Sequence, residues 1–166
     1  MKIFRFLLAP IFGLLVFMFT VTVIEGIGHA VYPPPAEISQ LATQLTDAMA
    51  NEDQGALVEI QSKLEVAMSA YLETAPVGAM LFVVLAWIGS AFFGGLAAAA
   101  TAPVTRLPMA LFIGIIDVFG IMTVSLQFKH PVWMPVIGMV GAILMSLLAG
   151  WLVSRRIRST APEPAA

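Results

Sequence analysis

Cysteine is absent from the 166 residues of this chain. Its absence excludes disulfides, thiolate zinc sites, cysteine-ligated iron–sulfur clusters and a thiol nucleophile. Charged residues are scarce too, at 11% of the chain, whereas soluble domains carry about a quarter. The eight lysines and arginines form no basic patch of the kind that binds nucleic acid. We also find no glycine-rich phosphate loop, metalloprotease motif, nucleophile elbow or paired carboxylates, so the sequence predicts no enzyme.

Apolar residues dominate instead, at 60% of the chain, and give a mean hydropathy of +0.95. They concentrate in four runs, over residues 6–28, 76–100, 108–128 and 131–153. A helix rises about 1.5 Å per residue, so about 20 apolar residues cross a bilayer core. Because lipid offers no partner to an unsatisfied backbone group, each run is expected to be helical. The composition therefore predicts an all-α, polytopic membrane four-helix bundle.

The same pattern divides the chain into seven segments. We expect transmembrane helices at 1–31, 76–100, 108–128 and 129–153, an acidic extracytoplasmic loop at 32–75, a cytoplasmic loop at 101–107, and a basic, then disordered, cytoplasmic tail at 154–166. The first apolar run exceeds the h-region of a signal peptide, about 7–15 residues, and carries Glu25 near its end. It is therefore expected to remain as an uncleaved anchor.

Basic residues predict the orientation. Lys63 and Lys129 fall on one side of the predicted membrane, and the other six fall on the opposite side: Lys2, Arg5, Arg106, Arg155, Arg156 and Arg158. Cytoplasmic flanks of membrane helices are enriched in lysine and arginine. We therefore expect a protein of the bacterial inner membrane with both termini in the cytoplasm and residues 32–75 outside.

Three consecutive prolines, Pro33 to Pro35, end the first apolar run. Beyond them, apolar residues recur at helical spacing on both sides of a turn at residues 51–55, which predicts an inserted helical hairpin. Seven acids and one lysine supply its polar face. The simplest interpretation is a solvated outer face whose apolar side rests on the bundle. A docking surface for a partner protein and the collection of cations are the alternatives.

The chain carries signs of an internal repeat. An offset of 101 residues aligns residues 5–34 with 106–135, and eight of the thirty pairs are identical, among them Gly13/Gly114 and His29/His130. Small residues, which let membrane helices approach closely, also recur every four residues in two of the predicted helices. These stripes are Ala86, Ser90, Gly94 and Ala98, and Gly138, Ala142, Ser146 and Gly150. We predict two helical hairpins of the same orientation, related by a pseudo-twofold axis along the membrane normal, as in some transporters and structural bundles.

Several polar residues lie where lipid makes them costly. Glu25 and His29 are one turn apart near the outer end of the first helix, and the repeat places His130 at the same depth. One interpretation is a local Glu25–His29 hydrogen bond that locks the helix end. Others are a proton or cation site, a metal held by Glu25, His29 and His130, or a haem between the two histidines. Tyr32 and Trp133 are expected at the membrane–water interface, where aromatic residues gather.

Asp117 lies near the middle of the third apolar run, with no basic residue in any such run to pair with. Insertion scales assign an unfavourable free energy of about 2.5–3.5 kcal/mol to placing an aspartate at the centre of a membrane helix. We expect either a protonated carboxyl that joins helices through a hydroxyl such as that of Ser90 or Ser146, or a group that faces a wet cavity as a proton or cation relay.

Three motifs carry a resemblance. They are the stretch from Glu25 through His29 and Tyr32 to Pro35, the stretch Pro76 to Ala79 with Ala86-Trp87 and Gly94-Gly95, and His130-Pro131 followed by Trp133. The chain resembles a family of small, uncharacterised bacterial inner-membrane proteins with four helices. The resemblance spans the helices but not the acidic loop, and it implies a fold and topology without an activity. It also implies that Glu25, His29, the triple proline, Trp87 and the His130-Pro131 pair belong to the family pattern and that Asp117 does not.

Together these features favour a non-catalytic accessory or scaffold subunit of a membrane assembly, with no cofactor. Its partners would be lipid and either another membrane protein or a second copy of the chain. The first alternative is a small carrier or channel for protons or cations, with Glu25, His29, Asp117 and His130 as polar stations. The second alternative is a metal- or haem-binding membrane protein.

Overall fold

The computed structural model describes residues 2–159, so most of the predicted tail, from residue 160 on, lies outside the described residues. Within that part the chain forms helices and no strand, which confirms the all-α fold class. The elements are α1 (Lys2–Val31), α2 (Ala36–Ala50), α3 (Gln54–Thr74), α4 (Val77–Thr101), α5 (Arg106–Gln127) and α6 (Trp133–Ser159). Helices α1, α4, α5 and α6 are long and apolar enough to cross a membrane. The protein is an integral membrane protein.

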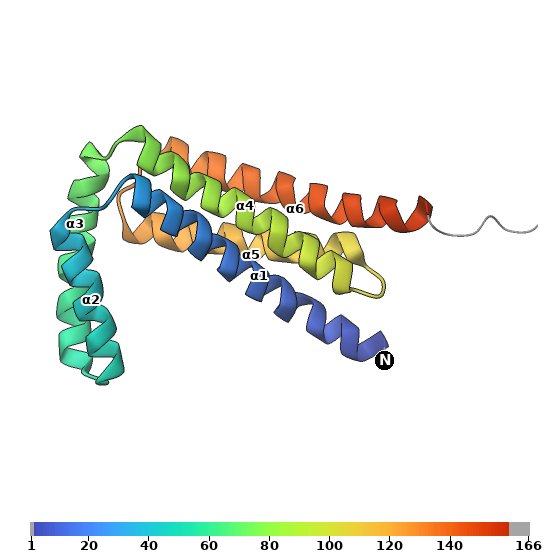
Figure 1. Ribbon diagram of the computed structural model, residues 1–166, viewed down its shortest axis with the longest axis horizontal. Helices are drawn as coiled ribbons and strands as arrows, with labels where there is room; N and C mark the ends of the chain where they lie inside the picture. The colour runs from blue at the N-terminus through green and yellow to red at the C-terminus, as the bar shows by residue number, and fades with distance from the viewer. Residues whose placement is uncertain (1, 160–166) are drawn as a thin grey trace, which may run out of the picture.

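These four helices run side by side as an elongated bundle, and the α2–α3 hairpin projects from one end, across the bundle direction (Figure 1). Helix α4 is central, because it packs against α1, α5 and α6. Helix α1 packs chiefly against α4 and diverges from the other helices toward its N-terminus (Figure 1). The hairpin packs mainly on itself.

Small residues bring the helix backbones together. All eight stripe residues predicted from the sequence are buried. A Cβ built on Gly94 of α4 would come within 2.9 Å of the Gly13 carbonyl oxygen of α1, and one on Gly150 of α6 within 2.9 Å of Leu107 Cα in α5. Contacts this close are available only to glycine, and they supply the dispersion that holds helices together where lipid removes the hydrophobic effect.

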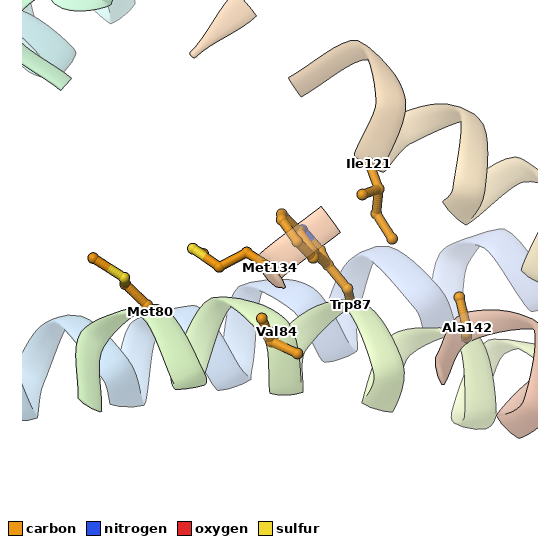
Figure 2. Close-up of a cluster of buried hydrophobic side chains, with 7 residues drawn as sticks. Met80, Val84, Trp87, Ile121, Met134 and Ala142 are labelled. Carbon is orange, nitrogen blue, oxygen red and sulfur yellow. The ribbon is translucent and has the colours of Figure 1, made fainter. Parts of the chain in front are cut away.

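A cluster of buried hydrophobic side chains lies in the half of the bundle nearer the hairpin. Trp87 lies at the centre of this group, with residues of α4, α5 and α6 around it (Figure 2). They are Met80, Val84, Ala91, Ile121, Met134 and Ala142. Close packing here fixes the ends of α4, α5 and α6 that carry the hairpin and the α5–α6 connection.

The two ends of the fourth membrane helix differ most from the sequence prediction. Helix α5 ends at Gln127 and α6 begins at Trp133, so His130 lies in the connection and does not open the fourth membrane helix. The reason is Pro131, because a proline disfavours helical backbone angles at the residue before it. Helix α6 also continues to Ser159, past the predicted end at residue 153.

Charge is segregated along the bundle. Arg5 lies in the first turn of α1, Arg106 begins α5, and Arg155 and Arg156 lie in the last turns of α6. All four therefore lie at the end opposite the α2–α3 hairpin (Figure 1). Arg155 stacks on the ring of Trp151 at 5.3 Å from its centroid. The hairpin, by contrast, exposes seven carboxylates: Glu37, Asp47, Glu52, Asp53, Glu59, Glu65 and Glu73.

Candidate functional site

A cavity of about 420 Å³ lies where the α2–α3 hairpin meets the end of the bundle. Its walls come from α1, α2, α3, α4, the end of α5 and the α5–α6 connection. Most of the wall is apolar, and a few polar side chains interrupt it. This size and lining are typical of sites for small molecules.

The cavity brings together three residues that the sequence singled out. Glu25 and His29 reach it from the last turns of α1, and His130 reaches it from the α5–α6 connection. Within residues 2–159, however, Glu25 and His29 form no hydrogen bond with each other. In the same part of the chain, no three His, Asp or Glu side chains cluster closely enough to hold a metal ion. The three residues thus share a cavity as separate polar groups.

The ring of His130 is fixed by its neighbours. Its Nδ1 lies 2.9 Å from the carbonyl oxygen of Phe128, two residues earlier. Because a carbonyl oxygen only accepts, Nδ1 carries the hydrogen, and in the neutral ring Nε2 is then the acceptor. The ring also lies 6.1 Å from that of Trp87 and 6.4 Å from that of Phe128, centroid to centroid.

Aromatic side chains form much of the remaining wall. Tyr32, just after α1, packs its ring 6.1 Å from that of Phe82 in α4 and lies directly over Gly78. Tyr71 of α3 and Phe128 complete this set. The sequence prediction missed Tyr71, Phe82 and Phe128 as site residues. Only Tyr71 left a signal, since it continues the apolar stripe of α3.

The two aromatic residues expected at the membrane interface have different surroundings. Tyr32 lines the cavity between bundle and hairpin. Trp133 begins α6 and is half-buried against the core around Trp87. Tyr32 and Trp133, which the 101-residue offset aligns, therefore do not share a common environment.

Asp117 lies in the bundle core, away from the cavity. It belongs to the buried face of α5, between Gly114 and Ile121, and is only 3% exposed. Its Oδ2 atom has no hydrogen-bonding partner among the described residues. The expected bond to Ser90 or Ser146 is not formed there, because those hydroxyls donate to the Trp87 and Ile143 carbonyls of their own helices, at 2.8 and 2.9 Å.

The α2–α3 hairpin carries one ion pair. Lys63 Nζ donates to Glu59 Oε1 at 2.6 Å, one turn apart on α3. The hydrogen bond from Lys63, and then its charge, lower the pKa of Glu59 below its usual value. Asp53 serves a structural role, because its carboxylate caps α3 by accepting from the Ala56 backbone nitrogen at 3.0 Å.

Comparison with family models, with curated proteins and with solved structures gave no match. The family resemblance suggested by the sequence motifs therefore stays a prediction.

Proposed function

We propose that this protein is a non-catalytic accessory subunit of a membrane assembly. Its bundle anchors it in the bilayer, and its α2–α3 hairpin docks on a basic, outward-facing surface of a larger membrane protein. The contact surface is the acidic tip of the hairpin, which we define as Asp47, Glu52, Asp53 and Glu59. The observation that carries this proposal is that the hairpin packs mainly on itself and holds these acids, all exposed, away from the bundle (Figure 1).

Charge complementarity supports a basic partner. Near the tip, Lys63 neutralises only Glu59, so three carboxylates remain to attract a positive surface. Exposed charges at the edge of an interface speed association and help to select the partner, and salt weakens their attraction. The apolar side of the hairpin faces the cavity, where Ile38, Leu64 and Leu72 lie, so the acidic side is left for a partner.

The bundle itself supports an anchoring role. Its helices meet through glycine, alanine and serine, and the Gly13 and Gly114 pair of the proposed repeat lies against small residues of α4 and α6 respectively. Such contacts leave little room for a wide aqueous path between the helices.

The orientation and location belong to the proposal. Arginines at the end of the bundle opposite the hairpin favour that end as cytoplasmic by the positive-inside rule. The hairpin would then face the outside of a bacterial inner membrane, where the partner's outer domain lies.

Quantitative cross-linking in native membranes tests the docking surface. The variant Asp47→Asn/Glu52→Gln/Glu59→Gln removes three tip charges and keeps the Asp53 cap. We expect it to lose a cross-linked hetero-complex that the unmodified chain and Glu37→Gln both form. The complex should also weaken as salt rises, because exposed charges are screened. Equal cross-linking by the tip variant would refute the acidic tip as the contact. A product containing only this chain would identify a homo-oligomer and refute a partner subunit.

One observation favours a second candidate function, a small carrier for protons or cations. Asp117 is a buried carboxyl with an unpartnered oxygen in the middle of the bundle. Ionisable groups inside membrane helices commonly belong to proton or ion paths. In proteoliposomes this alternative predicts proton-coupled flux that Asp117→Asn and Glu25→Gln each reduce. Flux unchanged in both variants would reject it.

A further inference from the structure

We propose that the cavity between the hairpin and the bundle binds an amphiphilic organic cation, such as a hydrophobic amine or quaternary ammonium. This site goes beyond the proposed docking role, since it uses the inner side of the hairpin and leaves the acidic tip to a partner. Its volume of about 420 Å³ and mostly apolar wall suit a compact hydrophobic molecule.

The charged residues around the cavity favour a positively charged ligand. Glu25 is the one carboxylate among the described residues that line it, and no lysine or arginine lines it in that part of the chain. The nearby Lys63 and Lys129 are both exposed and do not line the cavity. An anion would therefore meet one carboxylate and no compensating cation, whereas a cation would pair with Glu25 in a half-desolvated site.

The aromatic residues in the wall also favour binding of a cation. Tyr32 and Phe82 stand 6.1 Å apart, and Tyr71 and Phe128 complete the aromatic part of the lining. The face of an aromatic ring attracts a cation, and the attraction grows when water is excluded. Rings and a single carboxylate together form a receptor for a bulky, weakly hydrated monocation. A small metal cation would instead need several oxygen or nitrogen ligands, and no such cluster occurs within residues 2–159.

A phospholipid head group is a poorer occupant. Phosphatidylcholine and phosphatidylethanolamine carry a cation, but their phosphate would find no lysine or arginine on the described wall. The cavity is also closed in by α2 and α3, whose Ala42 and Leu64 contribute to it from the outer side. The occupant we infer is therefore a free amphiphilic cation.

The test uses the full chain in nanodiscs of phosphatidylglycerol, with tetraphenylphosphonium as the cationic probe and tetraphenylborate as its anionic counterpart of similar shape. We expect saturable binding of the phosphonium and none of the borate. Glu25→Gln should weaken phosphonium binding about tenfold or more, because it removes the charge and keeps the shape. Glu37→Gln, which removes an exposed hairpin charge that does not line the cavity, should change it less than twofold.

A second pair of variants covers the case in which Glu25→Gln fails to fold. Ala42 lies on the exposed hairpin and lines the cavity, so Ala42→Trp should fill the site and abolish saturable binding. Ala50→Trp, at the end of the same helix and outside the lining, should not. Equal binding of phosphonium and borate, or full binding by Ala42→Trp, would overturn the proposal. Competition by added phosphatidylcholine would overturn a free cation as the occupant.

Discussion

The indole ring of Trp87 lies against the backbone of Gly138, where α4 and α6 meet. A Cβ built on Gly138 would come within 2.5 Å of Trp87 Cε3 and 3.3 Å of Ile121 Cδ1. Trp87 is itself packed among buried residues of three helices, so it has little room to move (Figure 2). Gly138 is therefore needed for the close approach of α6 to α4.

Gly138→Ala should lower the free energy of unfolding by about 1–3 kcal/mol, the usual cost of overpacking a core. The measurement is thermal or denaturant unfolding in detergent, followed by circular dichroism. Gly120→Ala is the matched control, because nothing lies within 4 Å of the Cβ it would add on α5. That control should be neutral or slightly stabilising, since alanine favours helix. Equal stability of the two variants would show that Trp87 relaxes easily.

The repeat makes a prediction about a pair of glycines. An added Cβ on Gly13 would come within 2.7 Å of Ala98 Cβ in α4, and one on Gly114 within 2.7 Å of Ser146 Cβ in α6. If the helix pairs α1–α4 and α5–α6 are repeats of each other, Gly13→Ala and Gly114→Ala should both destabilise the bundle. Ala98→Gly should rescue the first, and Ser146→Gly the second. Double-mutant cycles of unfolding should give coupling of about 0.5–3 kcal/mol for each pair. Coupling in only one pair would argue against equivalent packing.

The sequence predicted the membrane helices well, because bilayer thickness imposes a length and lipid imposes apolar side chains on each of them. It placed the start of the fourth helix too early, at residue 129, whereas Pro131 keeps the backbone before it out of the helix and α6 begins at Trp133. Local backbone chemistry, and not hydropathy, determines that boundary.

The candidate site could be predicted only in part. Glu25, His29 and His130 were found because polar groups at membrane depth are costly, and the structure places all three around one cavity. Phe82 and Phe128 could not be found, since an aromatic residue in an apolar run has no distinguishing pattern. The cavity itself depends on how the hairpin lies over the end of the bundle, which is a tertiary relationship with no local signature.

The Glu59–Lys63 pair leads to a prediction about pH. Lys63 lowers the pKa of Glu59 in the folded chain, so the pair contributes stability above the unfolded pKa and loses it as pH falls through the folded pKa. Titration by NMR of labelled glutamate should give Glu59 a pKa below the usual value for glutamate. Lys63→Gln should raise the pKa of Glu59 toward that usual value. Because both partners are largely exposed, high salt should also reduce the difference. A pKa of Glu59 that ignores the Lys63 substitution would show that the pair does not persist.

Asp117 provides the last prediction, because within residues 2–159 no hydrogen bond offsets the burial of its carboxyl. Its Oδ2 atom is unpartnered within the described residues, and the hydroxyls of Ser90 and Ser146 are already bonded to their own helices. Asp117→Asn keeps the shape of the side chain, removes its ability to ionise and replaces one carboxyl oxygen by an NH2 group with two N–H donors. We expect it to raise the free energy of unfolding, because a neutral amide carries no charge that must be desolvated or neutralised in the bundle.

Asp47→Asn is the matched control for this substitution, since it makes the same chemical change at an exposed position of α2 and should leave stability unchanged. Both variants are compared with the unmodified chain by unfolding in detergent. A loss of stability in Asp117→Asn would mean that the carboxyl joins helices through an interaction that the amide cannot make. A gain would leave function as the reason for an acid in the middle of the bundle, because a group that weakens the fold does not contribute to holding it together.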